Sequence, residues 1–271
     1  MLDAVWHAVA RSIADAIGRS CEAQQTSLIG GGCINQGFRL LAGEREYFVK
    51  LNAASMLPMF EAEAAGLEEI TATRSVRVPR PICTGRDGER AWLTLEYLPL
   101  SPAEPRAMAL MGERLAAMHR ATQTHFGWKL DNTIGSTSQV NRQELDWTEF
   151  WGRHRLGYQL ELAYRNGHGG ALHERGQMLL ERLGRLLGGH RPVASLLHGD
   201  LWGGNVAASA DGEPVIFDPA VYYGDREADL AMTHLFGGFA PEFYRAYHHA
   251  WPLESGHCER RELYKSSIQH P

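Results

Sequence analysis

The chain of 271 residues is 44% hydrophobic and 22% charged, which is ordinary for a globular protein and long enough for one large or two modest domains. Its formal net charge of −5 provides no basic field for nucleic acid or anionic lipid, so we expect neither as a partner. The four cysteines are scattered without a CxxC pair, a usage that favours a reducing compartment over a disulfide framework.

The N-terminal segment predicts an amphipathic helix, because apolar residues recur there at three- and four-residue spacing: Val5, Trp6, Val9, Ile13 and Ile17. Asp3, Asp15 and the absence of a basic start distinguish this segment from a signal peptide. No apolar run approaches the ~18 residues that a membrane-spanning helix needs. We therefore expect a cytoplasmic protein without a membrane partner.

The next part of the chain predicts a strand-rich lobe. Residues 26–52 are expected to form β-hairpins, with a Gly-rich turn inside the first pair and a second turn at residues 42–44. Residues 59–73 predict one internal helix, whose apolar face contains Phe60, Ala64, Leu67 and Ile70. Residues 91–98 are a β-rich run that ends before Pro99.

Three prolines between residues 98 and 105 indicate a hinge, and beyond it the apolar spacing becomes helical. We expect helices near 108–118 and over 146–165, 171–189 and 229–236, with short apolar runs at 195–200 and 214–220. These elements predict an α+β fold of two domains. A small antiparallel β lobe covers residues 1–98, a larger and mainly helical lobe covers residues 99–271, and a ligand cleft is expected where they meet.

The octapeptide HGDLWGGN, residues 198–205, has residue types that suit phosphoryl transfer. In kinases a catalytic-loop Asp accepts the proton of the attacking hydroxyl, and an Asn five positions later binds magnesium. Asp200 and Asn205 have this spacing, and Asp218 follows an apolar run as a second magnesium ligand would. A single Asp in a turn is more often a cap, but the three residues together favour a catalytic base and a Mg²⁺ site.

The N-terminal lobe offers groups for the phosphates of a nucleotide. Lys50 ends the strand-like run YFVK after the Gly-rich hairpin, as the phosphate-binding lysine of kinases does, although most strand lysines are edge residues. Glu63 lies on the following predicted helix, where it could pair with Lys50. Glu61 is the alternative partner, and Glu63 is favoured because it is one helical turn before Leu67 on the core-facing side.

The segment GGGCINQG, residues 30–37, departs from the G-x-G-x-x-G pattern because Asn35 stands where the third glycine would be. A hairpin turn is the commoner explanation for such a segment. One strand before the lysine, however, Gly31 and Gly32 could offer backbone N–H groups to phosphate. Cys33 could be redox-sensitive if those donors lower the pKa of its thiol, with an inert small residue as the alternative.

The remaining candidate residues lie at the end of the predicted strand over residues 91–98 and in the polar segment that follows residues 214–220. In a kinase architecture adenine would bond backbone groups near Glu96 and Leu98, so the identity of their side chains carries little information. Asp225 and Asp229 are expected to be structural, with Asp229 as the cap of the helix over residues 229–236.

Several segments together resemble the fructosamine/ketosamine-3-kinase family: LLHGDLWGGNVA, PVIFDPAVYYGDREADLAMTHLFGGF, GGGCINQGF, MFEAEAAGL, VPRP, IGSTSQVN and DWTEFW. This family is part of the aminoglycoside-phosphotransferase branch of the protein-kinase-like fold, and the resemblance runs from about residue 5 to residue 264. It implies ATP- and Mg²⁺-dependent phosphorylation of the 3-hydroxyl of a ketosamine, a sugar attached to an amine by glycation. The phosphorylated product breaks down, so that the amine is restored.

The resemblance implies a role for each matching residue: Asp200 as the base, Asn205 and Asp218 as magnesium ligands, Lys50 with Glu63 as the pair that orients ATP, and Trp202 as an aromatic wall of the acceptor pocket. A packed core indole is the alternative for Trp202. The chain departs from the family in its last residues, KSSIQHP, where relatives usually continue with a further apolar helix. A truncation or altered reading frame there would weaken the C-terminal lobe.

Three readings of the function remain open at this stage. The acceptor could be a small-molecule ketosamine or a glycated protein lysine, derived from fructose, ribulose or erythrulose. Another kinase of the same branch, acting on an aminoglycoside or choline, is the alternative enzyme. A pseudokinase that only binds nucleotide is a third class, which the presence of the base, the metal ligands and the lysine disfavours. The oligomeric state is open between a monomer and a redox-linked dimer through Cys33.

Overall fold

The computed structural model describes residues 3–30 and 34–266, which form two compact units. The N-unit contains residues 1–103 and 207–219, and the C-unit contains residues 104–206 and 220–271. The units therefore differ from the expected division at residue 98, because a later segment returns to the N-unit. Among the described residues, no helix is long and apolar enough to cross a membrane.

The core of the N-unit is a five-stranded antiparallel sheet in the order β1-β2-β3-β5-β4. Its strands are β1 (Ala23–Ile29), β2 (Gln36–Ala42), β3 (Arg45–Ala53), β4 (Pro81–Asp87) and β5 (Arg90–Glu96). The expected hairpins and the β-rich run before Pro99 are thus confirmed. Residues 31–33, between β1 and β2, lie outside the described residues, so the Gly-rich turn expected there stays a prediction.

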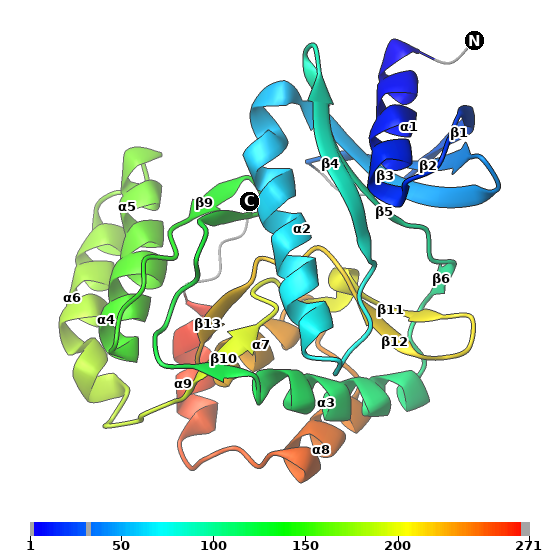
Figure 1. Ribbon diagram of the computed structural model, residues 1–271. Coiled ribbons are helices and arrows are strands. Elements are labelled where there is room, and N and C mark those ends of the chain that lie inside the picture. The colour runs from blue at the N-terminus through cyan, green and yellow to red at the C-terminus, as the bar shows by residue number, and fades with distance from the viewer. Residues whose placement is uncertain (1–2, 31–33, 267–271) are drawn as a thin grey trace. The chain divides into compact units, whose positions relative to one another are not determined.

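Helices α1 (Ala4–Ile17) and α2 (Leu57–Ala72) pack against opposite faces of this sheet, as Figure 1 shows. Successive residues of a strand point to opposite faces. In β3, Val49 therefore joins the apolar cluster that contains Trp6 and Ile13 of α1. The next residue, Lys50, points to the other face, where α2 lies. Both helices were expected from their apolar spacing.

A second, three-stranded sheet explains why the later segment belongs to the N-unit. It contains β6 (Leu100–Ser101), β11 (Val206–Ser209) and β12 (Pro214–Ile216) in the order β12-β11-β6. Ser209 pairs with Leu100, and the backbone N–H of Ile216 donates to Arg77 O at 3.0 Å. These backbone hydrogen bonds hold the end of β12, and with it Asp218, on the N-unit.

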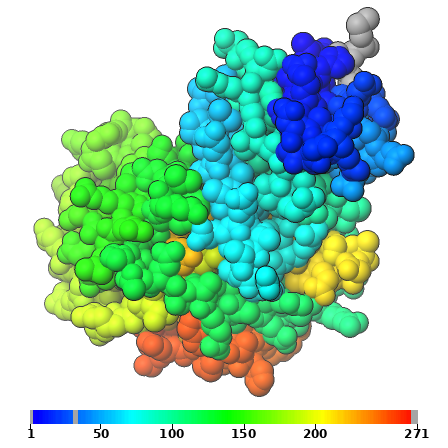
Figure 2. Space-filling view, viewed as in Figure 1, coloured from blue at the N-terminus to red at the C-terminus, as the bar shows by residue number. Residues whose placement is uncertain are grey.

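In the C-unit, α3 (Pro105–His119) packs along α8 (Pro241–Ala250), as Figure 1 also shows. The helical stretch expected over residues 146–165 is interrupted by a π-helical turn: it consists of α4 (Trp147–Trp151), the turn η2 (Gly152–Leu156) and α5 (Gly157–Arg165). Together with α6 (Ala171–Leu186), these elements form one continuous green region of the C-unit surface in Figure 2.

The C-unit also contains a short antiparallel sheet in the order β13-β10-β7, and α3 packs against its central strand. Its strands are β7 (Thr122–Gln123), β10 (Ala194–Leu197) and β13 (Tyr222–Gly224), and a separate hairpin is formed by β8 (Asn132–Ile134) and β9 (Thr137–Gln139). Helix α7 (Arg226–Thr233) follows β13, and α9 (His257–Lys265) packs against it. Neither α8 nor α9 was predicted.

Helix α7 begins earlier than expected, which corrects the role given to Asp229. The cap of α7 is Asp225, whose Oδ1 accepts a hydrogen bond from the backbone N–H of Glu227 at 3.0 Å. Asp229 lies inside the helix and is 2% exposed. The helix was predicted to begin at residue 229 because the apolar spacing starts at residue 230. The true first turn of α7 consists of charged residues that are buried, so the predicted start was about one turn too late.

Candidate functional site

Lys50 is the centre of a buried ionic cluster in the N-unit. Its Nζ donates to Glu63 Oε1 at 2.6 Å and to Asp218 Oδ1 at 2.7 Å. The partner on α2 is thus Glu63 and not Glu61. The side chains of Lys50 and Glu63 are 7% and 10% exposed, whereas that of Asp218 is 44% exposed. The cluster therefore has a closed side at α2 and an open side at the second carboxylate.

The charges in this cluster depend on one another. Burial alone would lower the pKa of Lys50, but the carboxylates of Glu63 and Asp218 outweigh it and raise that pKa well above its usual range. Burial raises the pKa of Glu63, against the attraction of the ammonium group. Two carboxylates share one ammonium, so the cluster can accept further positive charge at its open side.

The backbone of Asp218 has an unusual conformation. Its φ of 58° lies in the left-handed region, where only three described residues other than glycine are found. This conformation costs free energy and persists where the surroundings impose it, commonly at functional sites. Here the preceding strand β12 and the ion pair with Lys50 hold the residue.

The turn before β2 is attached to β3 by the residue that breaks the glycine pattern. Asn52 Nδ2 donates to Asn35 Oδ1 at 2.7 Å and to Ile34 O at 3.0 Å. An asparagine at position 35 therefore anchors the turn where a glycine would leave it free. Gly31, Gly32 and Cys33 lie outside the described residues, and their expected phosphate-binding and redox roles stay predictions.

The two residues expected near adenine differ in their backbone contacts. The backbone N–H of Glu96 donates to Arg80 O at 2.9 Å, and its carboxylate accepts from Arg77 Nη2 at 2.9 Å. Leu98 follows β5, and within residues 3–30 and 34–266 its backbone N–H donates to no backbone carbonyl. The N–H of Glu96 is thus bonded to Arg80, and a role of Glu96 or Leu98 at adenine stays a prediction.

In the C-unit, the loop that carries Asp200 is held by the buried carboxylate of Asp229. Its two oxygens accept hydrogen bonds from the backbone N–H groups of His198 at 2.7 Å and Gly199 at 2.9 Å. The Nε2 of His119, on α3, donates to the same carboxylate at 3.1 Å. Helices α3 and α7 thus fix the two residues that precede Asp200.

Charge and backbone geometry both support this arrangement. Burial opposes the charge of Asp229, but the hydrogen bond and charge of His119, with the loop N–H groups, hold its pKa below the usual range. Gly199 has a φ of 81°, and a Cβ there would lie 2.0 Å from Ala220 O. Only glycine fits this position.

Asp200 and Asn205 lie close together within the same loop. The amide Nδ2 of Asn205 donates to Asp200 O at 2.8 Å and to Asp200 Oδ2 at 3.2 Å. With Nδ2 engaged, the amide oxygen is the atom of Asn205 that can bind a cation. Carboxylate and amide oxygens are the donors that Mg²⁺ prefers, so the chemistry of Asn205 and Asp218 fits the predicted metal.

Trp202 is half-buried and lies two residues after Asp200 in the same loop. A Cβ on Gly204 would lie 2.2 Å from its ring, so the indole covers that glycine. Its ring also meets Phe236 edge to face at a centroid distance of 5.3 Å. The indole is therefore not a fully buried core residue.

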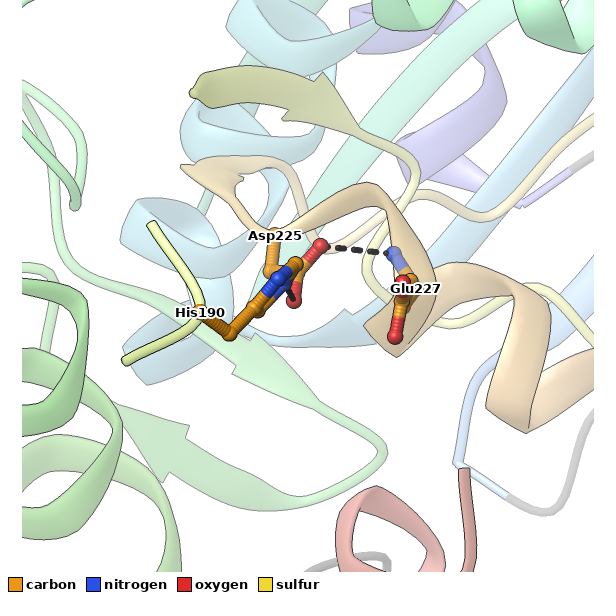
Figure 3. A group of neighbouring side chains, drawn as sticks. All are labelled: His190, Asp225 and Glu227. Atoms are coloured by element: carbon orange, nitrogen blue, oxygen red, sulfur yellow. Dashed lines mark hydrogen bonds and ion pairs between the residues drawn. The ribbon is translucent and has the colours of Figure 1, made fainter. Parts of the chain in front are cut away.

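A group of three side chains in the C-unit has metal-ligand atoms within 4.8 Å of one another: His190, Asp225 and Glu227 (Figure 3). Its atoms already have protein partners. Asp225 Oδ2 accepts from His190 Nε2 at 2.8 Å and from the hydroxyl of Tyr264 at 2.6 Å. Both oxygens of Glu227 accept from Arg260 at 2.7 Å. We therefore assign this group to the docking of α9.

A cavity of about 510 Å³ lies among α7, α8 and α9. Its lining combines apolar residues such as Leu230 and Leu253 with histidines such as His234 and His248. Its lining includes Glu227 and His234 of the segment 214–239, but none of the residues predicted to act as base, metal ligand or nucleotide contact.

Sequence reasoning missed two residues that position the loop. His119 and Tyr247 form a hydrogen bond of 2.8 Å, and His119 in turn holds Asp229. No local pattern marks His119, because its partners lie more than 100 positions later in the chain. Asp229 was noticed at the start of the run DLAMTHLF, but because the apolar spacing begins just after it, it was interpreted as a helix cap.

Comparisons with known proteins agree with the sequence motifs. The model of the fructosamine kinase family matches residues 5–266. A probable ketoamine kinase of Synechocystis sp. is 47% identical over 262 residues, which cover 96% of this chain and 88% of the relative. The chloroplastic protein-ribulosamine 3-kinase of Arabidopsis thaliana is 40% identical over 250 residues, which cover 91% of this chain and 76% of the relative.

Solved structures agree with the fold. A candidate fructosamine-3-kinase of Haemophilus somnus has a TM-score of 0.88 at 28% identity, covering 95% of this chain and 86% of its own. An aminoglycoside phosphotransferase in a ternary complex with ADP and hygromycin B has a TM-score of 0.65 at 13% identity. The match covers 96% of this chain and 88% of that structure's chain. The second likeness shows the fold alone, and it confirms the predicted α+β, protein-kinase-like architecture.

The family match spans nearly the whole described chain, and the curated relatives are phosphotransferases that act on hydroxyl groups. The resemblance predicted from the sequence motifs is therefore confirmed. The chain belongs to the fructosamine kinase family of phosphotransferases.

Proposed function

We propose that the protein uses ATP to phosphorylate the 3-hydroxyl of ketosamines and thereby promotes deglycation. The family match over residues 5–266 is the observation that supports this most strongly. The acceptor is a small-molecule ketosamine or a glycated protein lysine, the two classes to which the names of the relatives point. The alternative enzyme acts on an aminoglycoside or choline.

In the proposed reaction Asp200 is the general base. It accepts the proton of the 3-hydroxyl as that oxygen attacks the γ-phosphorus of ATP; a new O3–P bond forms, and the bond between phosphorus and the ADP oxygen breaks. The hydrogen bond from Asn205 Nδ2 orients the carboxylate, and Asp229 holds the loop that carries it. Such positioning can account for much of the rate of a phosphoryl transfer.

Lys50 is proposed to contact the α- and β-phosphates of ATP. Its ion pair with Glu63 fixes the ammonium group and keeps it charged. Asn205 and Asp218 are proposed to supply oxygen ligands to Mg²⁺, which when bound neutralises charge on the phosphate oxygens. The backbone near Glu96 and Leu98 is proposed to bind adenine, and Gly31 and Gly32 to cover the phosphates.

A panel of acceptors tests this function. The purified protein is incubated with ATP and Mg²⁺ and with fructose-lysine, ribulose-lysine, ribosylated lysozyme, an aminoglycoside or choline, and ADP release is followed. We expect turnover with the ketosamines, loss of turnover with EDTA, and a product whose phosphate ³¹P NMR locates on O3. Turnover with the aminoglycoside or choline alone would favour the alternative enzyme. ATP binding without turnover of any acceptor would favour a pseudokinase.

A further inference from the structure

The segment IGSTSQVN, residues 134–141, contains two of three buried amide side chains that the site described above does not include. Gln139 lies on β9 opposite Asn132 of β8, and Asn141 follows β9. The three residues are 5%, 9% and 0% exposed, in that order. Burial of an amide costs free energy unless its N–H and C=O groups find partners, so three such residues together require an explanation.

These three residues form an amide relay that begins at a buried arginine. Asn132 Oδ1 accepts hydrogen bonds from Asn141 Nδ2 at 2.9 Å and from Gln139 Nε2 at 2.8 Å. Asn141 Oδ1 accepts from Nη2 of Arg155 at 2.6 Å, and Arg155 is 8% exposed. Since a guanidinium group can only donate, it determines which end of Asn141 is the acceptor. Each amide then sets the orientation of the next.

The amide relay ends on two backbone carbonyls. Gln139 Nε2 also donates to Ala220 O at 3.1 Å, and Asn132 Nδ2 donates to Val221 O at 2.9 Å. Ala220 and Val221 are 2% and 1% exposed, and both lie in the irregular segment between β12 and β13. Buried carbonyls need hydrogen-bond donors, and in irregular backbone side chains commonly supply them. Gln139 and Asn132 are such donors.

Ala220 contacts the loop that carries Asp200 through both of its backbone groups. Its N–H donates to His198 O at 2.8 Å, and its carbonyl oxygen lies against Gly199, where a Cβ would approach to 2.0 Å. Asp229, on α7, holds the N–H groups of the same two loop residues. The backbone just before Asp200 is therefore held from two sides, by α7 and by the segment that the amide relay orients.

We propose that Gln139 is a positioning residue for Asp200. Gln139 fixes the carbonyl of Ala220, and Ala220 fixes His198 and Gly199, so that the carboxylate of Asp200 stays where it accepts the proton of the acceptor hydroxyl. A fully satisfied buried polar network specifies one arrangement, whereas an apolar side chain at position 139 would hold the carbonyl of Ala220 by no directed bond. This role rests on the proposed function, and it does not require Gln139 to touch a substrate.

Two Gln139 variants and a matched control test the proposal. Gln139→Met keeps the length of the side chain without its N–H donors. Gln139→Glu keeps the shape and replaces the amide nitrogen by an oxygen, so it decides the question if Gln139→Met does not fold. Gln177→Glu makes the same replacement at an exposed position on α6 of the same unit.

ADP release is measured with the ketosamine that the parent protein prefers, at a temperature where each variant is folded. We expect each Gln139 variant to lower kcat about tenfold, which corresponds to the net free energy of one hydrogen bond. The KM for the acceptor should stay within about twofold, because the bond that is lost acts on the base and not on the bound acceptor. Gln177→Glu should change neither quantity.

A double-mutant cycle separates positioning of the base from stabilisation of the fold. Each Gln139 variant is combined with Asp200→Asn, and its residual kcat is compared with that of Asp200→Asn alone. A residue that acts through Asp200 has no base left to position in this background, so the residual kcat should stay within about twofold. A residue that only stabilises the fold should lower kcat by the same factor on both backgrounds.

The outcomes distinguish this proposal from the proposed function. Failure of the parent protein to phosphorylate any ketosamine would refute both. Turnover by the parent protein, with an unchanged kcat in the Gln139 variants, would refute the role of Gln139 alone. An equal fall in kcat with and without the carboxylate of Asp200 would also refute it, and would show that the amide relay serves only to stabilise the hairpin.

Discussion

Replacing Asp229 by asparagine should disable the loop proposed to be catalytic without touching Asp200. The carboxylate of Asp229 accepts three hydrogen bonds, from the backbone of His198 and Gly199 and from the imidazole of His119. Asparagine has the same shape but only one acceptor oxygen. In the least costly orientation the amide oxygen takes the place of Oδ2, which accepts from His198 N–H and from His119. The NH₂ group then takes the place of Oδ1 and faces the N–H of Gly199.

The cost of this change follows from those contacts. One backbone N–H is left buried and unpaired, which costs about 1–3 kcal/mol, and the two bonds that remain lose the assistance of a charge. We therefore expect Asp229→Asn to lower the free energy of unfolding by about 3 kcal/mol. At about 2–4 °C for each kcal/mol, the melting temperature should fall by about 6–12 °C. Displacement of the loop should lower kcat about 100-fold.

Differential scanning calorimetry and ADP release measure the two effects at a temperature where the variant is folded. Asp15→Asn is the control, because it removes the same charge from an exposed position on α1 and should change neither quantity. A variant with lower stability but the kcat of the parent protein would refute the reasoning. It would show that the three hydrogen bonds stabilise the fold and do not position the loop.

Lys50→Met should lower the free energy of unfolding in urea by about 3–5 kcal/mol, because it leaves the buried carboxylate of Glu63 without its partner. The double variant Lys50→Met with Glu63→Leu should recover most of that stability, whereas its ADP release should stay lost. Recovery of activity in the double variant would contradict the role of the pair. Burial lowers the pKa of His190, but Asp225 outweighs it and raises that pKa above the unfolded value. The resulting stabilisation is complete below pH ~6.5 and is lost as pH rises through the raised pKa, so the pH dependence of unfolding should be flatter in His190→Gln. An equal slope in both proteins would argue against this assignment.

The residues proposed for catalysis could be predicted because each one is marked by its neighbours in the chain. Lys50 closes the alternating run YFVK within β3, as the phosphate-binding lysine of kinases does, and Glu63 falls on the core-facing side of the next helix, so the kinase pattern and the periodicity together favoured their pairing. The contact between them follows from that placement. Asp218 was likewise marked by the apolar strand before it.

Features that depend on distant partners could not be predicted in this way. Helix α9 has a polar sequence, and its place in the fold depends on Arg260 pairing with Glu227, 33 positions earlier. The first turn of α7 is charged yet buried for the same reason, so its start was misplaced. Helix α8 did carry a local signal, since Phe243 and Tyr247 lie four residues apart on its buried side.

The membership of residues 207–219 in the N-unit also depends on distant contacts. The hinge was predicted from prolines, which mark a change in the chain but not the return of a later segment. That return is fixed by backbone hydrogen bonds between β11 and β6. Backbone pairing leaves little trace in the side chains of strands as short as these.

The central claim, that Asp200 is the base of a ketosamine kinase, is tested most directly by Asp200→Asn. ADP release is measured with ribulose-lysine and fructose-lysine, and ATP binding is measured in parallel by thermal shift. We predict that kcat falls at least about 100-fold, the usual contribution of a general base, while ATP stabilises the variant as it stabilises the parent protein. A variant that binds ATP and retains the kcat of the parent protein would contradict the claim.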